Sequence, residues 1–415
     1  MRSQPSPKAQ REDEKHKWEF KARFRRHAFG WKSQPAMTRI RQAVAEIKKA
    51  AKRNPMLAAE GAIMFLERVS PALEHVDSSS GAIGTAVNKA IAELVPIIAR
   101  APTDTKTRDA WLERLWEAYQ DDEIPYIESL SDYWGELCAS KETASEWADR
   151  LIGTVRMAWS PDPGRRGFFK GTTNCLSALV AAGRYDDVLA LLELAPFKTW
   201  HYRRYGVMAL TAQGKKAEAI RYAEEGRGIN DSPVDIARAL EAVLLSSGLA
   251  DDAYRRYGLV ANQAGTYLAT FRAVRRKYPH KTALEILADL VDTTPGEEGK
   301  WFAAAKDAGL YEEAIALAGR TPTDPKTLAR AARDFAETRP AFAMDAGLLA
   351  LHWLVQGYGY EITSADVWDA YRSTLAAADR LGTTADVKTR VRTMVAAEPA
   401  GERFVTKVLG RELGL

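Results

Sequence analysis

The sequence predicts an all-α protein whose C-terminal half is an α-solenoid, that is, a stack of antiparallel helix pairs. Alanine, leucine, glutamate and arginine dominate the middle and the end of the chain, and β-branched runs are scarce, which favours helix. Apolar residues recur at helical spacing, and a short glycine-centred motif returns at a near-constant interval. With 415 residues, 46% of them hydrophobic, the chain is globular but too long for one compact core.

The recurring motif has two small or apolar residues, three further positions, a glycine, an acid four residues later, and then Ala or Val. Its glycines are Gly183, Gly214, Gly248, Gly309 and Gly382. Its acids are Asp187, Glu218, Asp252, Glu313 and Asp386. The small residues that follow the acids are Val188, Ala219, Ala253, Ala314 and Val387.

Each part of the motif has a physical reason. A glycine that closes a helix can adopt the left-handed conformation, where a Cβ would be strained. An acid in the first turn of the next helix interacts favourably with free N–H groups and with the helix dipole. The small residue after it lets two antiparallel helices approach closely. Leu179, Leu210, Leu244 and Ala305, four residues before a glycine, form the matching stripe of the first helix.

The intervals indicate a two-helix repeat. Gly183 and Gly214 are 31 residues apart, and Gly214 and Gly248 are 34 apart. The next interval, from Gly248 to Gly309, is 61 residues, or two units, with Tyr278 at the missing glycine position. Periods of this length are typical of helix-pair repeats.

The motif resembles the second half of the tetratricopeptide consensus, in which a glycine, a helix-capping acid and a small residue follow at this spacing. The first-helix tryptophan and the closing proline of that consensus are mostly absent here, so the resemblance implies divergent units of uncertain superhelical curvature.

The N-terminal half is predicted to be helical but irregular. Five segments show helical apolar spacing, at residues 55–69, 81–101, 107–120, 125–139 and 143–159. Pro55 and Pro125 are expected at the first positions of helices. The predicted division is a basic tail with a first helix over 1–53, an N-terminal helical region over 54–165, and helical repeats over 166–415.

The tail concentrates positive charge. Residues 1–53 contain 16 Lys/Arg and 5 Asp/Glu, a balance of 16 − 5 = +11, which leaves 4 − 11 = −7 for the rest. Two interpretations stay open, with disorder expected up to Trp18 in either case. In one, the tail binds polyanions through Lys17, Lys21, Arg23, Arg25, Arg26 and Lys32. In the other, Trp18, Phe24 and Trp31 are buried as a clasp against the acidic body.

Several classes of protein are not expected. No apolar run approaches twenty residues and the start has no apolar core, so neither a membrane span nor a secretory signal is predicted. The only cysteines, Cys138 and Cys175, give neither a disulfide framework nor a zinc site. A cytoplasmic location is therefore expected.

The first candidate binding cluster is the segment WHYRRYG, which contains Trp200, His201, Tyr202, Arg203 and Arg204. Aromatic rings interleaved with arginines can stack a base or hold a phosphate. The same residues can instead form the packed start of a helix, with arginine stems lying over aromatic faces. The second interpretation is favoured.

The second candidate cluster follows in residues 262–281, with Asn262, Tyr267, Arg272, Arg276 and Lys277 as the candidate residues. In a helix over 266–277, Arg272, Arg275 and Arg276 share one face. That face fits an anionic ligand or an acidic peptide, and a solvated basic face is an equally good explanation.

No catalytic or metal motif is recognisable. His75 with Asp77 looks most like part of an enzyme site, but Asp77 or a following serine capping the next helix explains the segment. Glu297 and Glu298 are expected simply to start a helix. The chain is therefore predicted not to be an enzyme and to hold no cofactor or metal.

Four stretches, at residues 75–84, 122–140, 261–281 and 295–318, resemble an uncharacterised family of bacterial helical proteins of unknown function. Relatives of that module are attached to SWIM-type zinc fingers in some bacterial proteins. This chain has no cysteine–histidine set able to form one, so the resemblance implies an architecture and no activity.

The leading expectation is a non-enzymatic scaffold that binds a protein or peptide along the concave surface of its repeats. The alternatives are nucleic-acid binding through the tail and the 272–281 basic face, and an undetected hydrolase or transferase. The partner and the oligomeric state do not follow from the sequence.

Overall fold

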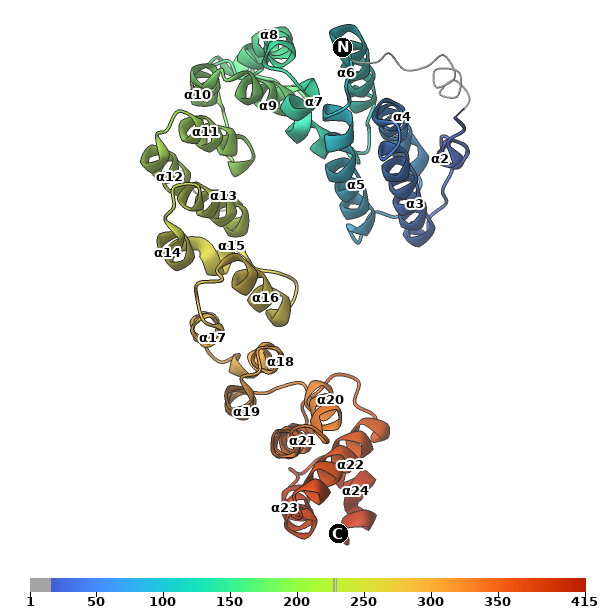
Figure 1. Ribbon diagram of the computed structural model, residues 1–415, viewed down its shortest axis with the longest axis vertical. Coiled ribbons are helices and arrows are strands. Elements are labelled where there is room, and N and C mark those ends of the chain that lie inside the picture. The colour runs from blue at the N-terminus through green and yellow to red at the C-terminus, as the bar shows by residue number, and fades with distance from the viewer. Residues whose placement is uncertain (1–15, 227, 229) are drawn as a thin grey trace. The chain divides into compact units, whose positions relative to one another are not determined.

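The computed structural model describes residues 16–226, 228 and 230–415, and throughout this part of the chain it is helical, with no β-strand (Figure 1). The predicted all-α class is confirmed. The chain forms two compact units, residues 1–232 (unit 1) and 233–415 (unit 2). The expectation of disorder before Trp18 lies outside the described residues for residues 1–15.

Unit 1 begins with the helical elements that precede the repeats. These are α2 (Glu19–Arg23), α3 (Ser33–Ala51), α4 (Pro55–Leu73), α5 (Ala82–Ala99), α6 (Thr105–Gln120), η1 (Glu128–Tyr133), α7 (Trp134–Cys138), α8 (Lys141–Ala158) and η2 (Pro163–Arg165). It continues with α9 (Thr172–Ala182), α10 (Tyr185–Leu194), α11 (Trp200–Ala212) and α12 (Lys216–Glu225).

The tail closes over unit 1 as an aromatic clasp. Trp18, Phe20 and Phe24 are at most 4% exposed and belong to the apolar core of the unit. The rings of Phe20 and Phe24 lie edge-on to Phe65 of α4, at centroid distances of 5.8 and 5.1 Å. A Cβ on Gly61 would come within 2.3 Å of the Trp18 ring, so a glycine is needed there.

The clasp prediction is confirmed for Trp18 and Phe24 and is wrong for Trp31. Trp31 is 72% exposed because its turn precedes α3 and no apolar surface covers the ring. The prediction for Pro55 is confirmed, since it begins α4 after the cap Asn54. The prediction for Pro125 is wrong, because the next helical element, η1, starts three residues later.

One buried arginine completes the C-terminal end of α5. Arg108 is 5% exposed and donates hydrogen bonds to the carbonyl oxygens of Ile98, Ala99 and Ala101 at 2.7, 3.2 and 3.1 Å. These carbonyls are among the last four of the helix, or follow it, and have no partner within it. The positive guanidinium also interacts favourably with the negative end of the helix dipole.

Unit 2 contains the remaining helical elements. The first are α13 (Pro233–Leu245), α14 (Ala250–Ala253), the π-helix η3 (Tyr254–Gly258), α15 (Leu259–Ala261), α16 (Tyr267–Lys277), α17 (Ala283–Asp292), η4 (Glu298–Trp301) and α18 (Phe302–Asp307). The others are α19 (Tyr311–Arg320), α20 (Pro325–Phe335), α21 (Pro340–Val355), α22 (Ser364–Arg380), α23 (Thr384–Ala396) and α24 (Phe404–Leu413).

The five motif glycines lie at corners between consecutive helices, and all are left-handed, with φ between +70° and +80°. At each corner, the residue after the glycine donates its N–H to the carbonyl oxygen four residues before the glycine, at 2.9 to 3.1 Å. This is the Schellman pattern of helix ends. The small residues after the acids are at most 5% exposed, which confirms that they are the contact positions of the second helix.

The corner without a glycine is built differently. Tyr278 ends α16 with φ −120°, in a conformation open to any residue, and its side chain is fully buried. Thr282 then starts α17 with a reciprocal capping box to Glu285. The interruption of the motif at this position therefore marks a longer corner, and the helix pair is kept.

The predicted boundary between residues 165 and 166 lies inside unit 1, where α8 packs directly against α9. The helix pairs of the repeat therefore begin within the first unit, and the two compact units divide between α12 and α13.

Among the described helices, α5 alone is long and apolar enough to cross a membrane, as judged by length and composition. Its apolar residues have protein partners, because α5 packs against α3, α4 and α7. Those that are buried are Ile83, Val87, Ala90, Ile91, Leu94, Val95 and Ile98.

Candidate binding sites

The WHYRR cluster forms the start of α11 and packs inward for the most part. Trp200 and Arg203 are 7% and 5% exposed. The Arg203 guanidinium lies 4.6 Å from the ring centroid of Tyr222, and Tyr202 lies edge-on to Trp159 at 5.1 Å. These contacts confirm the predicted packed helix start with arginine stems over aromatic faces.

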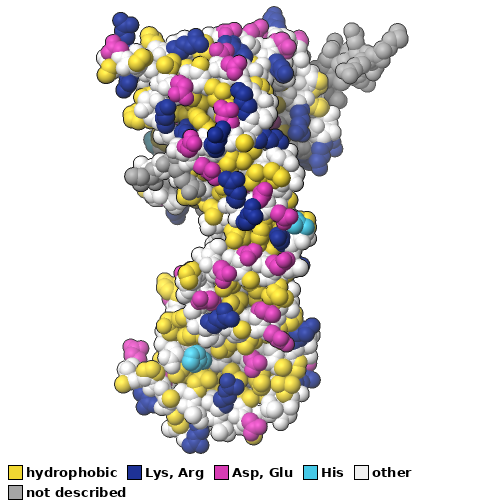
Figure 2. Space-filling model, turned by 90° about the vertical axis from the view of Figure 1, so that its left-hand side faces the viewer, with side chains coloured by type: hydrophobic (Ala, Val, Ile, Leu, Met, Phe, Trp, Pro, Cys, Tyr) yellow, Lys and Arg dark blue, Asp and Glu magenta, His cyan; other side chains and the backbone are white. Residues whose placement is uncertain are grey.

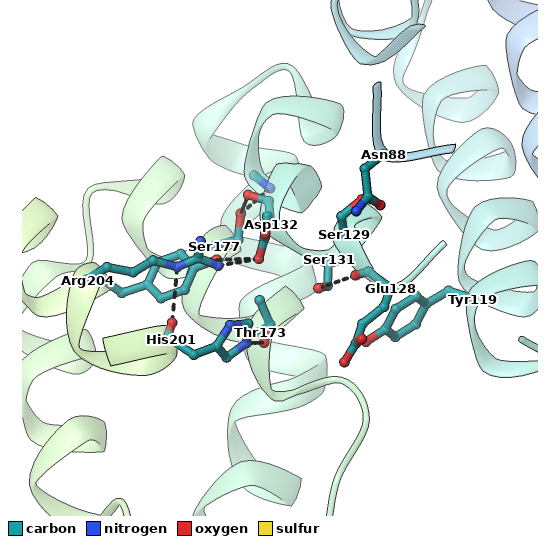
Figure 3. A network of polar contacts seen from close by, with 12 residues as sticks. Asn88, Tyr119, Glu128, Ser129, Ser131, Asp132, Thr173, Ser177, His201 and Arg204 are labelled. Atoms are coloured by element: carbon teal, nitrogen blue, oxygen red, sulfur yellow. Dashed lines mark hydrogen bonds and ion pairs between the residues drawn. The ribbon is translucent and has the colours of Figure 1, made fainter. Parts of the chain in front are cut away.

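The other two residues of this cluster, His201 and Arg204, reach toward η1 and α9 (Figure 3). Arg204 forms an ion pair with Asp132, and each side chain is 30% exposed. The hydroxyl of Tyr205 lies 3.4 Å from the same carboxylate oxygen. His201 Nε2 lies 2.9 Å from the hydroxyl of Thr173, at the start of α9.

The segment that carries Asp132 is fixed by neighbours on both sides (Figure 3). Ser177 of α9 donates to the backbone carbonyl of Asp132 at 2.9 Å and accepts from the Gly135 N–H at 3.0 Å. Ser129 donates to Asn88 of α5 at 2.8 Å. A Cβ on Gly135 would lie 2.4 Å from the carbonyl oxygen of Ser177, so glycine permits this close approach.

The hydroxyl–imidazole contact has the geometry of a nucleophile beside a base, but it lacks the group that orients the base. Asp132 is bound to Arg204, and among the described residues no carboxylate is hydrogen-bonded to His201. Desolvation, followed by the charge of Arg204, lowers the pKa of His201, while the charges of Asp132 and Glu128 act in the opposite direction. The contact therefore ties α9 to α11 and carries no argument for catalysis.

Part of the second cluster converges on a carboxylate that the sequence did not single out, Glu241 of α13. This side chain is fully buried. It accepts hydrogen bonds from Asn262 at 2.6 Å and from the Tyr278 hydroxyl at 2.5 Å, and its other oxygen lies 2.6 Å from Lys277 Nζ. A buried carboxylate is tolerated when it is paired and hydrogen-bonded in this way.

The π-helix η3 borders this network. Asn262 also donates to the carbonyl oxygen of Gly258 at 2.7 Å, and a Cβ on Gly258 would come within 3.0 Å of the Tyr278 ring. The rings of Tyr254 and Tyr278 meet edge-on at 5.1 Å, and Tyr254 donates to Asp289 at 2.5 Å. Desolvation and hydrogen bonding to a carboxylate raise the pKa of both tyrosines.

The predicted basic face of α16 is present but partly neutralised. Arg272 forms an ion pair with Asp307 of α18, with Nε 3.0 Å from Oδ2. Arg275 and Arg276 are exposed, and neither side chain has a hydrogen bond or ion pair with a described residue. Polyanion binding through this face remains a prediction.

Acidic residues also lie at the end of this segment. His280 and Lys281 both approach Asp251, at 3.2 and 3.5 Å. On the molecular face drawn in Figure 2, Lys and Arg side chains are mixed with Asp and Glu side chains and form no single basic area.

Tyr267 has a different setting, in a pocket of about 310 Å³ between α15, α16, α17 and η4. Its ring lies edge-on to Trp301, with the centroids 4.7 Å apart, and its hydroxyl donates to Glu297. Leu259 and Leu290 supply apolar wall, and further lining comes from Gln263, Thr266, Thr270, Thr293 and Thr294.

The six tail cations Lys17, Lys21, Arg23, Arg25, Arg26 and Lys32 are all exposed. Arg23 is bound to Glu19 and Gln42, and Arg26 lies 3.8 Å from Glu74. The side chains of the other four have no hydrogen bond or ion pair with a described residue.

The remaining candidates have local roles. Asp77 accepts from the N–H of Ser79 at 3.0 Å, which lowers the pKa of Asp77, and His75 stacks on His27 at 4.6 Å. Glu298 starts η4 as expected. Within the described residues, no group of three or more His, Cys, Asp or Glu is placed to hold a metal ion.

Sequence reasoning missed Asp132, Glu241 and Trp301. For Glu241 a signal existed, because it is a single acid in the apolar stripe formed by Ala237, Leu240 and Leu244 at helical spacing. A lone acid within a buried stripe indicates a satisfied internal carboxylate. Nothing in the local pattern around Asp132 or Trp301 indicates which distant residues they meet.

No family model matches this chain, and no curated protein and no solved structure shows significant similarity to it.

Proposed function

We propose that this chain is a non-enzymatic helical-repeat scaffold that binds a protein or peptide segment. In this proposal its helix pairs stack as a tetratricopeptide-like α-solenoid, and the binding surface runs along successive pairs. The shared geometry of the five glycine corners supports the stacking, since each repeats the same turn and buries the same positions.

The observation that carries the proposal is the pocket that contains Tyr267 and Trp301. Its volume of about 310 Å³ is at the small end of ligand pockets, which is suitable for one or two side chains of a bound segment. The edge-on pair of Tyr267 and Trp301 supplies rigid aromatic surface, of the kind that anchors binding interfaces.

The polar groups of the pocket suit a peptide backbone. Gln263 and Thr293 are exposed at its rim, and both side chains can exchange hydrogen bonds with main-chain N–H and C=O groups. The lining described above contains no cation, so an apolar or aromatic side chain flanked by peptide groups is the proposed ligand.

The test is selection of a random peptide library on the immobilised full chain, followed by affinity measurement on variants. Thr293→Arg places a long side chain at the pocket rim, and we expect it to weaken selected peptides at least about tenfold. Thr389→Arg is the matched control, because Thr389 is exposed on α23, away from the pocket lining.

Enriched peptides that bind both arginine variants as tightly as the unchanged chain would refute the pocket as the anchor. A selection that enriches no peptide over several rounds would refute the proposal as a whole.

A second candidate function, nucleic-acid binding, is favoured by the exposed cations Lys17, Lys21, Arg25 and Lys32, which have no described partners. Of the tail aromatics, Trp31 remains exposed for stacking, while Trp18 and Phe24 are buried. Substituting the four cations by glutamine should abolish binding of DNA or RNA at low salt and flatten its salt dependence. If the unchanged chain does not shift either nucleic acid at low salt, this candidate fails.

A further inference from the structure

Unit 1 has a groove between α3 and α5, with a volume of about 470 Å³. Its floor consists of small apolar residues, Val44 and Ala45 on α3 with Ala86 and Ala90 on α5. Small side chains on two neighbouring helices leave a trough in which the backbone of a third helix can approach closely. α4 packs against both of these helices.

The rim of this groove is strongly basic. It has five cations, Arg41, Lys48, Lys49, Lys52 and Lys89, and a single acid, Glu93. The rim balance is therefore 5 − 1 = +4. Glu93 is already bound to Lys48 at 2.8 Å.

The other four rim cations have no carboxylate within ion-pair distance among the described residues, and all four are exposed. Arg41 makes only weak contacts within its own helix, to Met37 and Thr38 at 3.4 and 3.3 Å. The field above the floor is thus positive and uncompensated, which favours a partner that brings carboxylates.

The spacing of the rim matches a helical partner. Arg41, Ala45, Lys48 and Lys52 follow one another at four, three and four residues, so they form one stripe along α3. The stripe is about 17 Å long at 1.5 Å per residue, which is the length of a three-turn helix.

We propose that this groove docks an acidic amphipathic helix of a partner protein. The helix places an Ala- and Leu-sized apolar stripe on the floor and glutamates or aspartates on its flanks, opposite the rim cations. This surface is separate from the pocket of unit 2, and the inference does not depend on the function proposed for that pocket.

Two other anionic surfaces fit less well. A membrane surface is flat and requires protruding Trp, Phe or Leu side chains, whereas this floor is recessed and lined by Val and Ala. Single-stranded nucleic acid requires exposed aromatic rings for stacking, and the lining of the groove contains none.

The test uses a fluorescein-labelled designed helical peptide of about fourteen residues, with a Leu/Ala stripe and flanking glutamates. Binding to the full chain is followed by fluorescence anisotropy. A peptide of the same composition with its stripe scrambled controls for charge alone. We expect the striped peptide to bind at least about tenfold more tightly than the scrambled one.

Two variants test the groove itself. Lys49→Glu with Lys89→Glu reverses rim charge and should weaken the striped peptide at least about tenfold, while Arg275→Glu with Arg276→Glu in unit 2 should leave it unchanged. Ala45→Arg adds a positive charge but fills the floor, and it should also weaken binding. Simple attraction of charges predicts the opposite effect for Ala45→Arg, so this variant separates docking from electrostatics.

The proposal is overturned if the striped peptide does not bind at about 100 μM, or if Ala45→Arg binds it as tightly as the unchanged chain. It is also overturned if vesicles containing phosphatidylserine, or a single-stranded oligonucleotide, bind more tightly and show the same sensitivity to the variants. Circular dichroism and thermal unfolding of each variant verify that the exposed substitutions leave the fold intact.

Discussion

The two candidate clusters, one in each unit, are both organised around a carboxylate, but the two carboxylates differ in burial. Asp132 in unit 1 is 30% exposed and is reached by the half-buried Arg204. Glu241 in unit 2 is fully buried and is met by Asn262, Lys277 and Tyr278.

The difference shows how burial decides what a cluster of cations and aromatic rings does. A carboxylate with access to water loses little when its partner is removed, because water can replace that partner. A buried carboxylate depends on every donor around it, and each donor in turn depends on the carboxylate. We therefore expect the Glu241 network to be a structural centre of unit 2, and the Asp132 contact to be a weaker fastening of α11.

The largest effect is expected for Glu241→Ala. The change leaves the buried hydroxyl of Tyr278 and the amide of Asn262 without an acceptor, and it should lower the free energy of unfolding of unit 2 by about 3 kcal/mol. Native-state hydrogen exchange of the amides in α13 and α16 measures the loss.

Glu241→Gln is the matched control for this prediction, because it keeps an acceptor and removes only the charge. It should cost less than the alanine change. A loss below about 0.5 kcal/mol for Glu241→Ala would contradict the central role of this carboxylate.

A smaller effect is expected for Asp132→Asn. The substitution keeps the size of the side chain and weakens its contacts with Arg204 and Tyr205, and it should cost about 0.5–1 kcal/mol, since both partners retain access to water. Exchange rates of the amides in α11 report the change. A cost equal to that of Glu241→Ala would remove the distinction between the two clusters.

The smallest effect is a pH dependence that arises from His201. Its pKa in the folded chain lies below the ordinary value of 6.5, so below pH 6.5 the unfolded chain binds the proton more readily. The free energy of unfolding should therefore fall as the pH drops from 6.5 through the folded pKa. The charges that face this ring are Arg204, Asp132 and Glu128.

His201→Gln should remove this component, so that the difference in unfolding free energy between the two proteins narrows from about pH 7.5 to about pH 5. An NMR titration of the His201 ring measures the pKa directly. A value above 6.5 would show that the two carboxylates dominate over desolvation and the Arg204 charge.

Much of the helical framework could be predicted from local pattern. A glycine such as Gly309 has to end a helix in the left-handed conformation, and the small residue Ala314 has to face the preceding helix, because both follow from chain stereochemistry and helical period. The N-terminal clasp could be predicted because burial of Trp18 and Phe24 removes a large apolar area from water. The start of η1 after Pro125 could not, because a 3₁₀ turn has no strong sequence pattern.

The sequence by itself determined the helical class, the glycine corners and the positions that face the next helix, since each depends on residues only a few positions apart. Only the tertiary structure decided which carboxylate meets which cation. Arg204 meets Asp132 across 72 residues, and Tyr278 meets Glu241 across 37. The α3–α5 groove likewise depends on helices that the chain brings together after an intervening one. Such pairings are selected by packing over the whole unit, and no local preference encodes them.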